Sequence, residues 1–183
     1  MIELVDGWIY YRDPYDTGIK QKYYHKDLTE LLDIRPQNGG EVFLPHTFNV
    51  GEHADDYRGP VWYQCVFDAQ PDWLDAHVEL KCNGIYRDAD VWLNGEKAGQ
   101  HYYDGFLGFV LPIHQCLKRG KNVLTIRVDN RYSAESLPFF HFFDWADDGG
   151  IFRPVYLVTK PKQHVQHVHL SALPVPEGCV KKG

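Results

Sequence analysis

The chain has 183 residues, of which 44% are hydrophobic and 24% charged, and it carries a formal net charge of −6 at pH 7. This acidic balance argues against nucleic acid or an anionic membrane surface as a partner, because both require a basic face. The sequence has no apolar run of about 18 residues, so we expect no membrane-spanning segment and no membrane partner.

The composition is typical of an all-β domain with one hydrophobic core. Aromatic residues make up 15% of the chain, and 16 glycines and 11 prolines favour many turns along it. The length suffices for one such core together with an additional arm or tail.

Two features bear on the cellular compartment. The N-terminus shows no basic segment followed by an apolar one, so no signal peptide is apparent. We therefore expect a cytoplasmic protein, although a secreted or periplasmic protein whose signal peptide was trimmed would give the same sequence.

The cysteines form no CxxC pair, which argues against a zinc ribbon or a redox motif. We expect no disulfide among Cys65, Cys82, Cys116 and Cys179.

Short strands dominate the prediction for the first half of the chain. Three leucines between residues 26 and 32 share a face and indicate one helical turn. Residues 77–82 alternate between polar and apolar, which is the period-two pattern of a half-buried strand. Residues 50–60 are a loop by composition. The strands predicted in this half are Trp8–Tyr11, Glu41–Asn49, Val61–Phe67 and His77–Cys82.

The second half of the chain continues the same pattern. Asn94-Gly95 between two strands is a strong hairpin signal, because a type I′ turn needs positive φ at both positions. Trp62 and Trp92 lie in the middle of predicted strands, and we expect both in the core between the sheets. The strands predicted here are Ala89–Leu93, Glu96–Gly99, Gly105–Ile113, Asn122–Asn130 and Ile151–Thr159.

Together these elements predict two antiparallel sheets packed face to face, a β-sandwich of the jelly-roll type. Alternation alone does not distinguish it from an immunoglobulin-like sandwich. Lys160-Pro161-Lys162 marks a boundary, so we expect one domain over residues 1–160 and a linker with one further strand over residues 161–183. That strand, His164–Pro174, has nothing after it to pair with, as at the opening of a further domain.

The long loop over residues 131–150 contains the most distinctive stretch of the sequence. Residues 139–148 are aromatic and acidic, and the pair Gly149-Gly150 follows them and permits a sharp turn. Aromatic rings cover the apolar face of a pyranose, and carboxylates accept hydrogen bonds from its hydroxyls. Since loops of this length in compact domains tend to be functional, the pattern favours a sugar site.

Five short motifs follow one another in a characteristic order. They are Leu44-Pro45-His46, Gly59-Pro60-Val61-Trp62-Tyr63, Val91-Trp92-Leu93-Asn94-Gly95, Asn122-Val123-Leu124 with Val128-Asp129-Asn130, and Gly149-Gly150-Ile151-Phe152-Arg153-Pro154-Val155. Each is weakly specific alone, but their order resembles the N-terminal jelly-roll, sugar-binding domain of glycoside hydrolase family 2. The resemblance covers roughly residues 5–160 and implies a galactose-binding-domain-like fold.

That family, which includes β-galactosidases, β-glucuronidases and β-mannosidases, places an immunoglobulin-like domain and a TIM barrel after the jelly roll. The barrel needs about 250 residues and carries two catalytic glutamates, so this chain is too short to hold it. The resemblance therefore implies a retaining enzyme acting on β-glycosides, with the missing domains of the same polypeptide as partners. We expect no catalytic residue in this chain itself, and residues 161–183 would begin the immunoglobulin-like domain.

The resemblance also implies candidate sugar contacts. Asp144 matches a loop aspartate that contacts sugar hydroxyls, Asn94 matches a hairpin asparagine that approaches the sugar, and Trp145 and Asp147 lie beside Asp144. Structural explanations compete with each assignment. Asp144 could cap backbone N–H groups, the type I′ turn accounts for Asn94, packing accounts for Trp145, and Asp147 could be a solvated turn acid.

The sequence also offers one alternative site and two alternative functions. His164, His167 and His169 lie close together, but no cysteine or carboxylate at short spacing completes a zinc set, so we expect no metal and no cofactor. A free-standing carbohydrate-binding module and a purely structural sandwich are the alternative functions. An exposed aromatic platform within the domain would favour the first of them.

Overall fold

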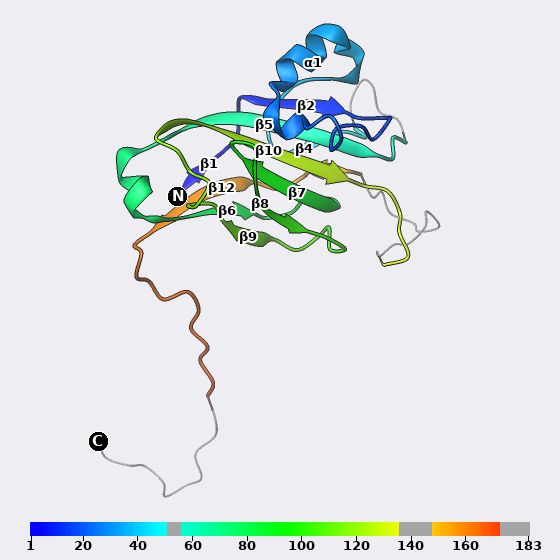
Figure 1. The fold of residues 1–183 in the computed structure, drawn as a ribbon. Coiled ribbons are helices and arrows are strands. Elements are labelled where there is room, and N and C mark those ends of the chain that lie inside the picture. Colours follow the sequence, from blue (N-terminus) through cyan, green and yellow to red (C-terminus); the bar gives the residue numbers. More distant parts are fainter. Residues whose placement is uncertain (51–55, 136–147, 173–183) are drawn as a thin grey trace, which may run out of the picture.

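The computed structural model describes residues 1–50, 56–135 and 148–172, and it confirms an all-β sandwich of antiparallel sheets (Figure 1). One sheet has the order β3, β2, β5, β10, β7, β8, and the other has the order β1, β12, β6, β9. The first comprises Gly39–Val42, Trp8–Arg12, Pro60–Ala69, Gly120–Asp129, Asp88–Leu93 and Glu96–His101. The second comprises Ile2–Glu3, Val155–Lys160, His77–Cys82 and Phe109–Pro112.

Smaller elements complete the fold. A two-stranded sheet pairs β4 (His46–Thr47) with β11 (Gly150–Ile151). The described residues form one α-helix, α1 (Leu28–Ile34), which is capped by Asp27, whose carboxylate accepts a hydrogen bond from the backbone N–H of Thr29. The described residues also form 3₁₀ turns at Tyr23–His25, Pro36–Asn38 and Pro71–Asp75. None of the helices in the described ranges is long and apolar enough to cross a bilayer.

The main core lies between the two large sheets. Successive side chains of a strand point to opposite faces, so alternate residues of β5 and β10 face β6 and β12. Full burial of each such side chain contributes about 1.5–3 kcal/mol to folding. Examples from three strands are Val61, Tyr63, Cys65, Leu124, Ile126, Val128, Val78 and Leu80, all of which belong to one buried cluster.

Trp62 and Trp92 are buried, but the prediction that they lie between the sheets is wrong. Both belong to a second cluster on the opposite face of the six-stranded sheet, where the segment containing α1 covers them. Tyr24 stacks on Trp92 with ring centroids 5.0 Å apart, and the buried carboxylate of Asp13 accepts a hydrogen bond from the Trp62 indole at 3.3 Å. Alternation shows which residues share a face, but not which segment covers that face.

Several strand predictions are confirmed to within two residues at each end, while two predicted strands are divided. Residues 41–49 form β3 and then β4, because Pro45 lacks the N–H that a continuous ladder requires. Residues 151–159 form β11 and then β12, with Pro154 in the interruption. Within residues 105–113, strand forms only over β9.

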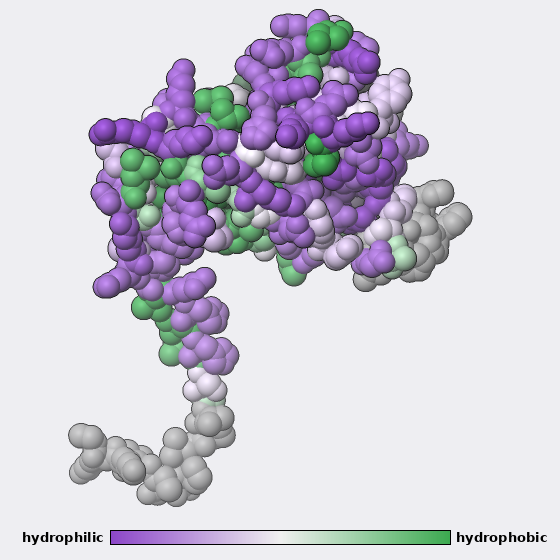
Figure 2. Space-filling model, viewed as in Figure 1, coloured by the Kyte–Doolittle hydropathy of each residue, from purple (hydrophilic) through white to green (hydrophobic). Residues whose placement is uncertain are grey.

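Residues 161–172 follow β12; Lys162 and His164 still contact Asp75 and His77 of the sandwich, and the segment beyond them runs away from it (Figure 1). The described part of the predicted strand, residues 164–172, forms no strand, and its assignment to a following domain stays a prediction. The face seen in Figure 2 is mainly hydrophilic over α1, and its apolar side chains gather toward the end from which this tail leaves.

Three of the four cysteines lie in the described ranges, and all three are free thiols. Cys65 and Cys82 are buried in the core, and this burial raises the pKa of both thiols, so they remain protonated at neutral pH. Cys116 is half-buried, and Cys179 lies outside the described residues.

Candidate functional site

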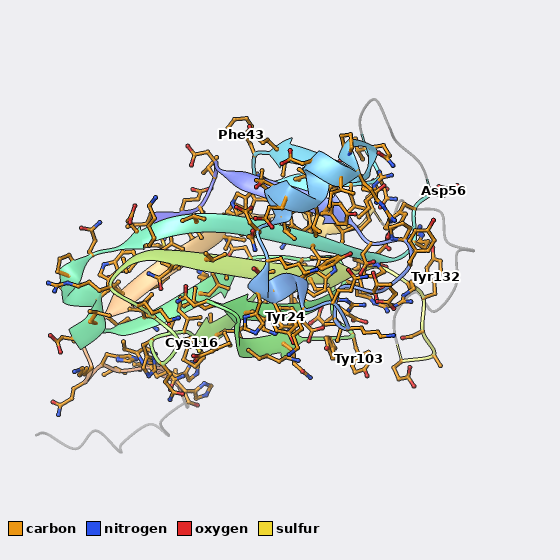
Figure 3. The ribbon with its side chains drawn as sticks, turned by 45° about the horizontal axis from the view of Figure 1, so that its top comes forward. Tyr24, Phe43, Asp56, Tyr103, Cys116 and Tyr132 are labelled. Carbon is orange, nitrogen blue, oxygen red and sulfur yellow. The ribbon has the colours of Figure 1, made fainter. Side chains whose placement is uncertain are left out.

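The candidate site is the end of the sandwich from which the aromatic-acidic loop leaves and to which it returns. The predicted sugar contacts Asp144, Trp145 and Asp147 lie outside the described residues. Both ends of the loop are described, however, up to residue 135 and again from the half-buried Asp148. Figure 3 shows Tyr132 and Asp56 at this end of the molecule.

The start of the loop is fixed by Asn130, a buried residue that directly follows β10. Its side-chain oxygen accepts a hydrogen bond from the backbone N–H of Gly59 at 2.9 Å. Its amide nitrogen donates to the carbonyl oxygen of Tyr57 at 3.0 Å and to Oδ1 of Asn49 at 3.4 Å. Asn130 therefore ties the beginning of the loop to the segment that precedes β5.

The end of the loop is fixed by Asn49, the same side chain that contacts Asn130. The backbone N–H of Gly149 donates to Oδ1 of Asn49 at 2.8 Å, and its carbonyl accepts from the N–H of Phe48 at 2.9 Å. Asn49 thus contacts both Asn130 and Gly149, so one side chain holds the two ends of the loop together. We call Asn49, Asn130, Gly149 and Gly150 the loop base.

The loop base requires two glycines for reasons of space. A Cβ on Gly149 would lie 2.1 Å from the Phe48 ring, and one on Gly150 would lie 2.4 Å from the carbonyl oxygen of His46. Gly150 also has a φ of +144°, in the region that favours glycine. Its N–H and C=O each bond to Tyr86 at 2.8 Å, so the chain re-enters the sandwich at a defined position.

A charged network lies beside the start of the loop. Arg131 contacts both oxygens of the buried Asp129, with Nε 3.0 Å from Oδ1 and Nη2 2.6 Å from Oδ2, and Arg127 approaches Oδ2 at 2.8 Å. Burial acts to raise the pKa of Asp129, but the hydrogen bonds from Arg131 and the charge of Arg127 outweigh it and lower the pKa. Asp16 bonds to both arginines. The network fixes the direction in which the chain leaves β10.

His46 lies under the returning strand β11, opposite Ile151. Its Nδ1 is 2.9 Å from the hydroxyl of Tyr63, and its ring packs against that of Tyr10 with centroids 4.9 Å apart. Burial, followed by the nearby charge of Arg12, lowers the pKa of His46 to about 4. The imidazole is therefore neutral at physiological pH.

We expect His46 to make folding stability depend on pH. The unfolded chain takes up a proton at His46 near pH 6.5, whereas the folded chain does so only near pH 4, so stability is lost as the pH falls between these values. After discounting for the partial exposure of the ring, the loss is about 1 to 2 kcal/mol. Urea unfolding at pH 7.5, 6 and 5 measures it. The variant His46→Asn keeps a polar group near the position of Nδ1 but does not titrate in this range. If the free energy of unfolding of this variant fell with pH as much as that of the wild type, the assignment to His46 would be wrong.

Asn94 lies at the other end of the six-stranded sheet. Asp88 of β7 pairs with Asp129, where the loop starts, whereas Leu93 pairs with Leu124, six residues away from Asn130 along β10. Figure 3 places Cys116, whose carbonyl accepts a hydrogen bond from Asn94, far from Tyr132. The structure therefore does not bring Asn94 to the loop base, and its approach to a sugar stays a prediction.

Within this chain the Asn94 side chain fixes the hairpin. Asn94 and Gly95 have φ values of +55° and +82°, which confirms the expected turn. Its Nδ2 donates to the carbonyl of Cys116 and to Oδ1 of Asn122, both at 2.8 Å, and its Oδ1 accepts from the N–H of Val123 at 3.0 Å. All three partners lie within the domain, so the amide is engaged structurally.

Replacing Asn94 with alanine is expected to lower the free energy of unfolding by about 2 to 3 kcal/mol, because both the hydrogen bonds and the tolerance of positive φ are lost. Asn94→Gly keeps the backbone freedom and loses only the hydrogen bonds, so its loss should be smaller, about 1 to 2 kcal/mol. Chemical denaturation of both variants checks this order. Equal stability of the alanine variant and the wild type would contradict it.

Sequence reasoning missed the polar groups of the loop base. Asn130 and Asp129 fall within one of the five motifs, so their position carried a signal, although nothing indicated their partners. Asn49 follows a proline turn and has no local signature. The side chains of the loop base form hydrogen bonds within the chain, so we expect them to position the loop rather than to bind sugar themselves.

A possible set of metal ligands lies elsewhere and combines distant parts of the sequence. Ligand atoms of His77, Glu79 and His164 lie within 4.8 Å of one another. Of the three histidines near the C-terminus, only His164 belongs to this set, so spacing alone did not reveal it.

The sequence is similar to a known protein family and to several known proteins. Residues 42–138, more than half of the chain, match the family model described as glycosyl hydrolase 2 galactose-binding domain-like. A putative β-glucuronidase of Formosa agariphila is 33% identical over 165 residues, which are 85% of this chain and 19% of that protein. A β-galactosidase of Thermoanaerobacter pseudethanolicus is 28% identical over 166 residues, 86% of this chain and 22% of that protein.

Solved structures show the same similarity. The β-glucuronidase of an uncultured Clostridium species superposes with a TM-score of 0.76 at 28% identity, covering 88% of this chain and 29% of that one. A Lactobacillus rhamnosus β-glucuronidase, at 22% identity and a TM-score of 0.76, shares the fold. The chain thus spans about a fifth of the length of the curated relatives that it matches.

Proposed function

This chain belongs to the glycosyl hydrolase 2 galactose-binding domain-like family, and on that premise we propose that it is the N-terminal, sugar-site domain of a larger retaining β-glycosidase. One observation carries the proposal. The loop base holds both ends of residues 131–148 at one end of the sandwich, through the contacts of Asn49 with Asn130 and Gly149. A sandwich that fixes a long aromatic-acidic loop in this way is suited to presenting it to a neighbouring domain.

In this proposal the loop completes a site whose catalytic glutamates lie on a barrel domain of the same polypeptide. Asp144 accepts hydrogen bonds from sugar hydroxyls, Trp145 covers the apolar face of the ring, and Asp147 is a second acceptor. The length of the relatives supports further domains, because this chain matches only about a fifth of each. An immunoglobulin-like domain would begin within residues 161–183.

The activities by which the relatives are named indicate the substrate class. They are β-glucuronidases and β-galactosidases, and the similarity does not separate the two. We therefore propose a β-glucuronide or a β-galactoside as the substrate. Both would be cleaved with retention by a pair of barrel carboxylates about 5–5.5 Å apart.

The test is to follow the coding sequence beyond Gly183 and to assay the whole encoded polypeptide with p-nitrophenyl β-D-glucuronide and β-D-galactoside. We expect hydrolysis of one of them by the whole polypeptide and of neither by the 183-residue chain. A reading frame that stops at Gly183 would contradict the proposal. Binding of galactose or glucuronate by the isolated chain with Kd below about 1 mM would then favour the free-standing module.

A further inference from the structure

A group of ligating side chains gathers at the end of the sandwich opposite the loop base. His77 begins β6, where it pairs with Lys160 at the end of β12, and Glu79 projects from the same face of β6 two residues later. His164 follows on the segment that leaves β12. One ligand atom from each of His77, Glu79 and His164 lies within 4.8 Å of the others.

A third imidazole lies beside this group, next to His77. The ring of His114 lies 4.7 Å from that of His77, and the ring of His164 lies 4.8 Å from that of His77. Nδ1 of His114 is buried and has no hydrogen-bond partner among the described residues. A buried, unsatisfied ring nitrogen is unfavourable and calls for an explanation, such as an ion that it ligates.

The carboxylate of Glu79 offers one of its two oxygens to a cation. Lys160 lies 2.6 Å from Oε2, while Oε1 lies 3.0 Å from Nε2 of His77. Lys160 thus holds one oxygen in place, while the other faces the imidazole of His77.

The tautomer of His164 is also defined. Its Nδ1 lies 2.8 Å from the carbonyl oxygen of Pro161, and since a carbonyl only accepts, Nδ1 carries the proton. In the neutral tautomer with this hydrogen bond, Nε2 carries the lone pair. A histidine that donates from one ring nitrogen to a backbone carbonyl and coordinates through the other is the usual arrangement at metal centres.

We propose that His77, Glu79, His114 and His164 bind one divalent transition-metal ion of the zinc type. Three imidazoles and one carboxylate make a four-ligand set that zinc prefers. Bonds of about 2.0–2.2 Å to the ion require the ligand atoms to move closer to a common centre. The ion would then replace the direct hydrogen bond between His77 and Glu79. His164 can supply much of this movement, because it lies on a segment outside the sheets.

Such an ion would fix the segment after Lys160 to the sandwich. His164 is the member of the set that belongs to the tail, and the other three belong to the body of the domain. The ion would therefore set the direction in which the chain leaves this end. The site is far from the loop base and does not depend on the proposed glycosidase function, so either can fail without the other.

The direct test titrates Zn²⁺ alone against the full 183-residue chain at pH 7.5, in competition with a chromophoric chelator. We expect one ion per chain with Kd below about 10 μM. His77→Ala and His164→Ala should each weaken binding at least about tenfold. His167→Ala is the matched control, since His167 lies on the same tail outside the set, and it should bind as the wild type does.

Further variants keep the result interpretable. His164→Ala changes no residue of either sheet, so its effect cannot be ascribed to unfolding. A variant with Cys116→Ser and Cys179→Ser should retain binding, because no cysteine belongs to the site. Absence of binding at 100 μM Zn²⁺ (about 10 times the expected limit), or equal affinity of the wild type and His164→Ala, would overturn the proposal.

Trypsin cleavage measures separately whether the ion holds the tail against the sandwich. Lys162 is 66% exposed at its side chain and lies between the last strand and His164, so trypsin can cleave after it. Saturating Zn²⁺ should slow this cleavage about tenfold or more in the wild type and leave the rate unchanged in His77→Ala. Equal cleavage rates with and without bound Zn²⁺ in the wild type would overturn the fixing of the tail.

Discussion

Replacing Gly150 with alanine is expected to lower the free energy of unfolding by about 3 to 5 kcal/mol. Two effects add at this position. The φ of +144° is strained for any residue with a Cβ, and the added carbon would lie 2.4 Å from the backbone oxygen of His46. A backbone atom cannot move aside as a flexible side chain does, so the pairing of β11 with β4 must be distorted. Denaturant unfolding of the variant measures the loss.

Alanine substitutions at two other glycines measure the effect of positive φ and the effect of the close contact separately. Gly120 has a φ of +75°, and a Cβ added there would have nothing within 4 Å, so Gly120→Ala should cost only about 1 kcal/mol. Gly149 lacks a positive φ, but its Cβ would lie 2.1 Å from the buried Phe48 ring, so Gly149→Ala should cost about 2 to 3 kcal/mol. If Gly150→Ala were no more destabilising than Gly120→Ala, the close approach to His46 would be wrong.

Replacing Asp144 with asparagine in the proposed whole β-glycosidase is expected to lower kcat/KM on the order of 100-fold. Hydrogen bonds to a charged acceptor contribute about 1.5 to 3 kcal/mol each, and every 1.4 kcal/mol is a factor of ten. The amide keeps the size of the side chain and loses its charge. Steady-state kinetics with the aryl glycoside that the enzyme hydrolyses gives the ratio directly.

Asp148 is the matched control for this prediction. It lies in the same acidic stretch, next to Gly149, and is half-buried at the end of the loop. We expect Asp148→Asn to change kcat/KM less than about threefold, because Asp148 adjoins Gly149, whose backbone is fixed in the loop base. Equal effects of the two substitutions would indicate a general influence of loop charge and would contradict a specific role for Asp144.

The sheets could be predicted from the sequence because their signals are local. In β6, for example, polar and apolar residues alternate over the whole strand, and its bounds of His77–Cys82 were predicted without error. The division of residues 151–159 was missed because apolar residues flank Pro154 on both sides. A proline in such a run marks a break more strongly than the apolar pattern marks continuity.

The remaining features depend on contacts between distant segments. Residues 13–35 have a weak pattern, so nothing local showed that they cover Trp62 and bury it on the outer face. The contact of Asn49 with Gly149 joins positions 100 residues apart, and His164 meets His77 only after β12 has paired with β6. Composition identified the aromatic-acidic loop, but only the fold shows how its two ends are held.

The measurement that tests the central claim most directly is a double-mutant cycle between Asp144 and the sugar hydroxyls. It compares kcat/KM of the wild type and Asp144→Asn for the aryl glycoside and for analogues that each lack one hydroxyl. A contact in the site predicts that the two changes are non-additive at one hydroxyl, by about 1.5 kcal/mol or more, and additive at the others. Additive effects at every hydroxyl would contradict the claim that this domain extends its loop into the sugar site.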